Sequence, residues 1–562
     1  MLMILGVVTV MKKGEAGRKG FMWKYIRKYK YQNAAVLGII ALINAVSVFC
    51  SLLLMILMHV ILEGSIQKTL FYGIVLIAVN VFLWTVLYPA SDVWMAKTIA
   101  LMNQAMREDI NQILMKKHYQ DLEGKDSGEY LSWYTNDIKE IEAQGFESFY
   151  MCGYDVFGLL MNTVVLGCIR LDLLFYTLLT AAVLYWATRK FEKKIESFSR
   201  RISDSMEEFT DALKEQLSGF LVWKAFGHLG DFRKHMEEAG EHLEEERYSY
   251  VKKKEKTNMM LQWINCVGGT INLAIVFAMC TLRILPVECL FGGNNFSGEI
   301  RSSVYNIMQY RVSIAGARAY FKKFSEMAGA TEEKEELPEI RQAIQVRDLS
   351  FAYADTNVLN HLDLEFTVGG KYAVVGKSGC GKSTLLKILL GQLKGYKGQV
   401  LFDGREAGQF ATDSFGKQMA YIEQNVFLFN TSIRENIILG RTVTDEELEE
   451  ALRRSALWEE MEHFPKGLDT VVGENGSLLS GGQKQRVAVA RALIHHCSVL
   501  VMDEGTSALD QKNAEVIEDA LTSCEDLTVI LVTHHLKKEK ETEYTAVYHM
   551  EQGGARQLCG AI

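Results

Sequence analysis

A long stretch near the start of this chain, Tyr31 to Leu62, contains no Asp, Glu, Lys or Arg. A helix needs only about 20 apolar residues to cross a bilayer, so this stretch predicts a membrane-spanning helix. Further uncharged or nearly uncharged runs cover residues 69–91, 148–169, 173–188 and 257–282. The first half of the chain is therefore predicted to be an α-helical membrane domain.

Two of these runs lie next to each other. The run 148–169 is interrupted only by Asp155, and the segment Arg170-Leu171-Asp172 separates it from the run 173–188. This arrangement predicts a hairpin of two spans with a tight polar corner between them.

A sixth span does not stand out by hydropathy. Between Ile284 and Lys322 lie five charged residues that weaken any hydropathy signal: Glu288, Glu299, Arg301, Arg311 and Arg318. An even number of spans would keep both ends of the chain on the same side of the membrane, so we expect six. On this sixth helix a polar face is predicted to line the transport path, formed by Glu299, Ser302, Ser303, Asn306, Gln309 and Tyr310.

Basic residues cluster between Lys12 and Lys30, ahead of the first span. By the positive-inside rule the N-terminus is expected in the cytosol. The charged segments 92–147 and 189–256 have helical patterns and are expected to extend the spans into the cytosol. The segment Phe21 to Tyr29 mixes aromatic and basic residues, as a helix lying in the membrane interface would.

The length of 562 residues suits two large domains, and the net charge of −8 gives no reason to expect a nucleic-acid partner. Ten scattered cysteines show no spacing typical of disulfide frameworks or zinc sites. We expect a basic N-terminus over 1–30, a six-helix membrane domain over 31–327, a linker over 328–342 and a soluble α/β domain over 343–562.

The soluble domain contains a phosphate-binding loop. An apolar strand, Lys371 to Val375, leads into a glycine-rich segment, and a helix is expected to follow it. The residues expected to hold nucleotide phosphates are Gly376, Ser378, Gly379, Cys380, Gly381, Lys382, Ser383 and Thr384. In such a loop backbone N–H groups approach the phosphates, the lysine reaches the β- and γ-phosphates, and the Ser383 hydroxyl ligates magnesium.

A second apolar strand, Ser498 to Met502, ends in Asp503 and Glu504. Ligands of α/β folds bind at the carboxyl ends of strands, which places this acidic pair at the nucleotide. Asp503 suits the magnesium shell, and Glu504 suits the base that polarises the attacking water.

Together with Leu479-Ser480-Gly481-Gly482-Gln483, these motifs make the chain resemble the ABC transporter superfamily. Within it, the chain is similar to exporter-type half-transporters, which fuse six spans to one nucleotide-binding domain. The matching motifs elsewhere are Phe351-Ala352-Tyr353, Tyr421 to Gln424, Phe427 to Ile437, Gly473 to Gly476, Ser507 to Asp510, and Thr533-His534. Gly128 to Asp137 and Glu215 to Phe226 resemble the two cytosolic coupling regions.

The resemblance implies a role for each motif. Tyr353 would stack on adenine, and Gln424 would touch magnesium and sense the membrane domain. His534 would assist Glu504 in hydrolysis. Ser480, Gly481, Gly482 and Gln483 would cap ATP bound to another chain, so two chains are expected to form the working unit, as a homodimer or as a heterodimer with a related chain.

The expected function is ATP-driven transport by alternating access, with ATP and magnesium as cofactors. The expected substrate is a peptide or another polar or amphipathic small solute, exported from the cytosol through the plasma membrane. Two alternatives stay open at this point. One is an exporter-shaped importer of a metal-chelating molecule, and the other is an ABC ATPase without a transport role.

Overall fold

A computed structural model describes residues 21–115, 117, 127–327, 334–353, 356–503, 511–524, 526–534, 536, 538–551 and 553–560. The chain divides into two compact units. The first comprises Met1–Met115 and Ser127–Gly329, and the second comprises Lys116–Asp126 and Ala330–Ile562.

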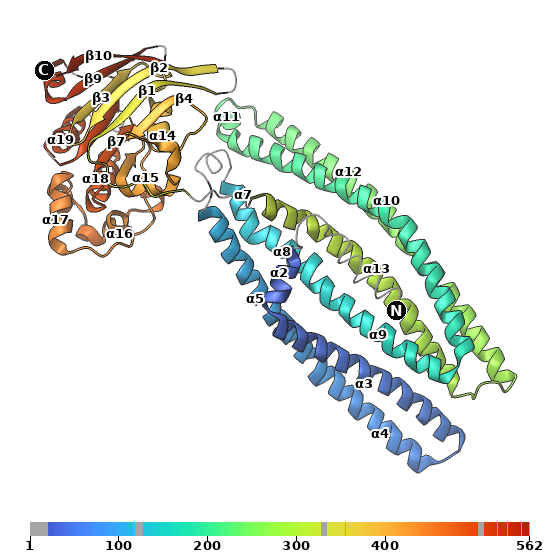
Figure 1. Ribbon diagram of the computed structural model, residues 1–562. Coiled ribbons are helices and arrows are strands. Elements are labelled where there is room, and N and C mark those ends of the chain that lie inside the picture. Colours follow the sequence, from blue (N-terminus) through green and yellow to red (C-terminus); the bar gives the residue numbers. More distant parts are fainter. Residues whose placement is uncertain are drawn as a thin grey trace. The chain divides into compact units, whose positions relative to one another are not determined.

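The first unit consists of long helices joined by short connections (Figure 1). In chain order its elements are α2 (Phe21–Lys28), α3 (Lys30–Leu62), α4 (Ile66–Phe82), η1 (Leu83–Leu87), α5 (Tyr88–Met115), α7 (Ser127–Ser132), η2 (Trp133–Asp137), α8 (Ile138–Ile141), η3 (Glu142–Glu147), α9 (Ser148–Ile169), α10 (Leu171–Ser218), α11 (Phe220–Ala225), α12 (Leu229–Thr281) and α13 (Cys289–Met327). The segments η1, η2 and η3 are π-helical turns that continue the neighbouring α-helices.

Helices long and apolar enough to cross a membrane coincide with the uncharged runs. Four such stretches lie in the described part of the chain: Lys30–Leu62, Ile66–Met115, Tyr130–Ile169 and Leu229–Thr281. Leu171–Ala187 forms a shorter apolar helix at the start of α10. The prediction of a helical membrane domain is confirmed. The segment predicted to lie in the interface forms α2, and its position in a membrane stays a prediction.

The predicted hairpin between the third and fourth runs is present. α9 ends at Ile169, and α10 begins at Leu171. Between them Arg170 takes an extended backbone conformation, with φ −159° and ψ 126°. Asp172 accepts a hydrogen bond from the backbone N–H of Leu173 at 2.9 Å and pairs with Arg170 at 3.2 Å. The polar corner therefore stabilises the start of α10, where an acidic side chain is favourable.

The sixth helix, α13, runs unbroken from Cys289 to Met327 and packs against α3, α9, α10 and α12. Its apolar side chains Phe296 and Ile300 are fully buried, and so are the polar side chains of Ser297 and Ser303. Hydropathy misses this helix because its charged and polar residues lower its mean hydropathy. Ser297, Arg301 and Ser303 are covered by neighbouring helices, whereas Glu299 is exposed.

The second unit is built on two sheets (Figure 1). Its strands are β1 (Ala343–Tyr353), β2 (Thr356–Thr367), β3 (Lys371–Gly376), β4 (Lys397–Phe402), β5 (Arg405–Glu406), β6 (Met419–Ile422), β7 (Val499–Asp503), β8 (Thr528–Thr533), β9 (Ala546–Glu551) and β10 (Gly554–Gly560). One antiparallel sheet has the order β2-β1-β4-β5, and the other has the order β10-β9-β3-β8-β7-β6. In the second sheet β9, β3, β8, β7 and β6 are parallel, so their carboxyl ends share one edge.

Helices and short 3₁₀ turns surround these sheets. They are α14 (Lys382–Leu389), η4 (Ala407–Gln409), α15 (Thr412–Gln418), α16 (Ile433–Ile438), α17 (Asp445–Arg454), η5 (Trp458–His463), η6 (Gly467–Asp469), η7 (Glu474–Gly476), α18 (Gly481–Ile494), α19 (Gln511–Thr522) and η8 (Lys538–Glu543). The strands β3, β7 and β8 are buried almost throughout, which is expected of parallel strands covered on both faces. The soluble unit is thus the predicted α/β fold.

Candidate nucleotide-binding site

The glycine-rich loop joins β3 directly to α14, as its sequence predicts. β3 ends at Gly376, and α14 begins at Lys382. Gly379 and Gly381 have φ angles of +80° and +100°, which L-residues with a Cβ rarely adopt. A Cβ on Gly381 would lie 2.6 Å from Leu359 Cδ2. The loop can therefore keep this path only with glycine at position 381.

Lys382 lies over the loop that precedes it. Its Nζ donates hydrogen bonds to the carbonyl oxygens of Gly376 at 2.7 Å and Lys377 at 3.0 Å. The Cys380 Sγ lies 4.0 Å from the same ammonium group. The lysine is therefore held beside the loop's backbone, where a bound phosphate would meet its charge. Ser383 is exposed and Thr384 is half-buried in the first turn of α14.

Asp503 ends β7 as a buried carboxylate. The Tyr421 hydroxyl donates to Asp503 Oδ2 at 3.4 Å, whereas among the described residues no hydrogen-bond donor reaches Oδ1. A buried carboxylate oxygen without a donor is costly unless another group meets it. Oxygen ligands are those that Mg²⁺ prefers, so the donor set here fits a magnesium ion.

His534 follows β8, and its ring Nδ1 lies 3.1 Å from the carbonyl oxygen of Gly376. The histidine is thus brought to the phosphate loop, although 158 positions separate the two residues in the chain. Gln424 is exposed, two residues beyond the end of β6. Because β3, β8, β7 and β6 are parallel neighbours, all these groups lie along one edge of the sheet.

Glu504, the predicted base, and the loop Ser507 to Asp510 lie outside the described residues. Their roles stay predictions. The position of Asp503, the residue before Glu504, is consistent with the assignment because β7 ends at the same edge as the phosphate loop.

Tyr353 ends β1, and its side chain is 48% exposed. The neighbouring Phe351 ring is buried and meets Tyr353 edge to face, with the ring centroids 4.9 Å apart. Phe351 therefore belongs to the core, and of these two rings only that of Tyr353 is exposed enough for adenine to stack on it.

The Leu479–Gln483 motif forms the start of α18. The Ser480 hydroxyl accepts from the backbone N–H of Gln483 at 3.2 Å, and Gln483 Oε1 accepts from the N–H of Ser480 at 2.9 Å. This capping box fixes the helix N-terminus, an end that attracts anions. Ser480 and Gly481 are exposed, and Gly482 is buried. The exposed face can therefore meet a ligand held by another molecule.

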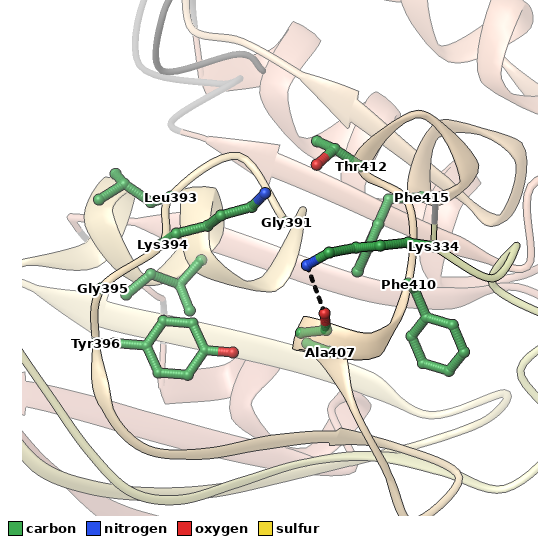
Figure 2. A pocket seen from close by; sticks show the side chains of 12 residues that line it. Lys334, Gly391, Leu393, Lys394, Gly395, Tyr396, Ala407, Phe410, Thr412 and Phe415 are labelled. Carbon is green, nitrogen blue, oxygen red and sulfur yellow. Dashed lines mark hydrogen bonds between the residues drawn. The ribbon is translucent and has the colours of Figure 1, made fainter. Parts of the chain in front are cut away.

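A separate hollow lies at the opposite end of α14, near Gly391 and Phe415 (Figure 2). Lys334 Nζ donates there to the carbonyl oxygen of Gly408 at 2.7 Å. Burial, with the Glu406 carboxylate nearby, raises the pKa of the Tyr396 phenol to about 12, so this group stays neutral. No residue of the phosphate loop lines this hollow, which distinguishes it from the nucleotide site.

Comparison with known proteins agrees with the motifs. The family model described as ABC transporter transmembrane region matches residues 34–296, and the one described as ABC transporter matches residues 359–507. The chain belongs to the ABC transporter family. As a member, it hydrolyses ATP and couples hydrolysis to transport across a membrane.

Among similar ABC transporters are two named ATP-dependent lipid A-core flippase. The protein from Photobacterium profundum is 27% identical over 451 residues, covering 77% of this chain and 75% of its own length. The protein from Sodalis glossinidius is 30% identical over 405 residues, covering 67% of each chain. A solved bacterial Atm1-family ABC exporter with ATP bound has the same fold, with a TM-score of 0.84, 20% identity and coverage of 94% of this chain and 95% of that one.

Some contacts of this ABC transporter's site could not be read from single motifs. Val358 and Leu359, on β2, press against the loop at Gly381, but no sequence signal connects them to a phosphate loop. Tyr421 stands beside Gln424 in the sequence, yet its hydrogen bond to Asp503 depends on the pairing of β6 with β7.

Proposed function

We propose that this chain works as a dimer that exports a polar or amphipathic solute across the plasma membrane. ABC exporters function as dimers in membranes, and the exposed start of α18 supports the same for this chain. ATP would bind with adenine against Tyr353 and its phosphates on the loop from Gly376 to Thr384. The Leu479–Gln483 motif of a second chain would cover the γ-phosphate.

The observation that carries this proposal is the edge of the parallel sheet. There Lys382, the donor-free oxygen of Asp503 and the His534 ring lie together, in a chain whose other half consists of membrane helices. Asp503, Ser383 and Gln424 are the residues that would hold a magnesium ion. Bound there, the ion would neutralise charge on the phosphates.

In the hydrolytic step, Glu504 would accept a proton from the attacking water. His534 is anchored near the Gly376 carbonyl oxygen and would orient the water and the γ-phosphate. The N–H groups of the phosphate loop and Lys382 would stabilise negative charge as the phosphoryl group departs. The exposed apolar helix α11, which bears Leu221 and Val222, would transmit closure to the membrane helices as the second coupling region.

Export from the cytosol is supported by the similar solved structure, which is an exporter. The basic N-terminal segment favours a cytosolic N-terminus, which suits an ATPase domain that uses cytosolic ATP. The relatives named as flippases move a lipid, which makes an amphipathic solute the first class to test. The polar face of α13 suits a solute with a polar part.

The proposal can be tested by transport into inside-out vesicles made from cells that produce the chain. A panel of labelled lipids, peptides and amphipathic drugs should contain compounds that accumulate when ATP and Mg²⁺ are added, and these should stimulate ATP hydrolysis by the purified protein. The Lys382→Ala protein should fail in both assays. ATP-independent uptake, or equal uptake by the Lys382→Ala vesicles, would contradict the proposal.

A further inference from the structure

Arg301 is a buried cation in the membrane unit. It lies on α13, twelve positions after the helix begins at Cys289, which is about 18 Å along the helix axis. The residue is only 5% exposed. In the part of the chain that the structure describes, no hydrogen-bond partner reaches its Nε or Nη1 atoms. A charge buried in this way is destabilising unless an anion meets it.

The neighbouring helix α12 leaves room for this guanidinium. A Cβ on Gly269 would lie 3.0 Å from Arg301 Nη2, and one on Gly268 would lie 4.0 Å from Arg301 Cδ. The same Cβ on Gly268 would lie 3.7 Å from Thr180 Cβ on α10. Two adjacent glycines therefore form a notch on α12, and the guanidinium lies in it among α10, α12 and α13.

A second polar group without a partner lies on the same face of α12 as the two glycines. Asn272 is fully buried, and within the described chain neither its Nδ2 nor its Oδ1 has a hydrogen-bond partner. It follows Gly268 by four positions and Gly269 by three, so the three residues share one side of the helix. Buried amides are normally hydrogen-bonded, so this one also indicates a missing ligand group.

Hydrogen bonds nearby show that unsatisfied groups are not general in this region. Thr177 Oγ1 on α10 donates to Ser297 Oγ on α13 at 3.0 Å, and Ser297 donates to the Gly293 carbonyl oxygen at 2.8 Å. Both side chains are fully buried and satisfied. Arg301, one turn after Ser297, and Asn272 are exceptions among well-paired neighbours.

We infer that Arg301 and Asn272 form a binding site for an oxyanion, a carboxylate or a phosphate, carried by the transported molecule. The guanidinium supplies charge and a fork of N–H donors that matches such a group. Asn272 supplies one more donor and an acceptor, which suits a hydroxyl or amide next to the anion. This inference rests on the proposed transport function and narrows the solute to an anionic one.

Binding can be measured through thermal stability, which does not depend on ATP hydrolysis. The protein in neutral-lipid nanodiscs would be titrated with dodecyl phosphate, with phenyl phosphate and with uncharged dodecanol. Wild-type protein should show a saturable rise in Tm with dodecyl phosphate, with or without a rise for phenyl phosphate, and none with dodecanol. A response to dodecyl phosphate alone would indicate a lipid-like solute, and a response to both would indicate a soluble one.

Variants separate this site from general charge effects. Arg301→Gln should lose the dodecyl phosphate response, or need at least about tenfold more ligand. Arg301→Lys should retain part of this response, because the positive charge remains although the planar set of N–H donors of the guanidinium is lost. Arg283→Gln removes one positive charge at an exposed position between α12 and α13, and should respond like wild type. Without ligand, Arg301→Gln should have a Tm equal to or above wild type, since it removes an unpaired buried charge.

A dodecyl phosphate response that survives in Arg301→Gln, or that is lost equally in Arg283→Gln, would overturn the inference. So would a dodecanol response of the same size in wild type. Basal ATP hydrolysis is measured in parallel, with Lys382→Ala as the inactive control. Normal hydrolysis without an Arg301-dependent response would refute the anion site alone, whereas wild-type protein without hydrolysis would refute the proposed function.

Discussion

At the scale of single residues, Gly381 is fixed both by its backbone and by its surroundings. Its φ of +100° is unfavourable for any residue with a Cβ, and the position of that Cβ is already occupied by Leu359 and the Val358 carbonyl oxygen. We expect Gly381→Ala to displace the loop and to weaken ATP binding by at least about tenfold, equal to about 1.4 kcal/mol. Binding of a fluorescent ATP analogue to purified protein measures this.

The control for this substitution is Gly416→Ala. Gly416 lies in α15, and a Cβ there would meet nothing within 4 Å. The control should bind ATP as wild type does. Equal affinities for Gly381→Ala and wild type would show that the loop tolerates a side chain at position 381 and that the described path is not required.

Glu504 is assigned as the base from its place after Asp503. Replacing it by glutamine keeps the size of the side chain and removes the group that accepts the proton. We expect Glu504→Gln to bind ATP normally and to hydrolyse it about 100- to 10,000-fold more slowly, a factor typical of general-base catalysis. Phosphate release and nucleotide binding are the measurements, with Lys382→Ala as a variant that loses binding. Hydrolysis by Glu504→Gln near the wild-type rate would refute the role.

Residues of the nucleotide site could be predicted from sequence because the chemistry restricts them to short motifs. The glycines, Lys382 and Asp503 lie next to strands whose apolar character is plain, and the structure places them on one sheet edge. The contacts of Val358, Leu359 and Tyr421 could not be predicted in this way, since they depend on how strands distant in sequence pack together.

At the scale of helices, α13 shows where hydropathy fails. Its charged and polar residues lower its mean hydropathy, and only the requirement for an even number of spans predicted it. Asn306 donates to Asp155 of α9 at 3.3 Å, so part of its polar face is paired across helices. A single sequence does not show that pairing, because Asp155 and Asn306 lie 151 positions apart.

The sequence predicts that the polar face of α13 lines the transport path, and labelling can test this prediction. Asn306 and Gln309 are half-buried in the structure. We expect Asn306→Cys and Gln309→Cys to react with a small charged thiol reagent several-fold faster in one nucleotide state than in the other. Peptide mass spectrometry would quantify the reaction with and without ATP trapped by Glu504→Gln.

Val164→Cys provides the comparison for this labelling experiment. Val164 lies on the span α9, and its side chain is 66% exposed, so it is expected to face lipid and to escape the charged reagent in both states. If Asn306→Cys and Gln309→Cys react at the same rate with and without trapped ATP, then α13 does not line a gated path.

At the scale of the whole molecule, one chain contains every motif of an ATP site, yet the motifs are expected to act between chains. The start of α18 carries exposed Ser480 and Gly481, ordered by a capping box. Such a helix N-terminus attracts a phosphate, but its exposure leaves it free to meet one that another chain holds. The sequence predicts this arrangement only through the family resemblance, because the motif itself does not show whether it meets ATP bound to its own chain or to another chain.

Mixing two inactive variants tests whether each ATP site is shared between two copies. One variant, Lys382→Ala, loses the lysine that contacts the phosphates. The other variant, Ser480→Arg, keeps that lysine but has a blocked N-terminus of α18. In a mixed dimer the intact loop of the Ser480→Arg chain meets the intact Ser480 of the Lys382→Ala chain, so one complete site forms. Random pairing gives such dimers about half of the time, so ATP trapping, scored as nucleotide retained after vanadate addition, should reappear on co-expression.

The control co-expresses wild type with the double variant Lys382→Ala/Ser480→Arg, whose mixed dimers contain no complete site and should add no trapping beyond that of the wild-type dimers. If the two single variants trap no nucleotide together, although tagged chains co-purify, then the sites are not shared between copies of this chain, and a related chain is the expected partner.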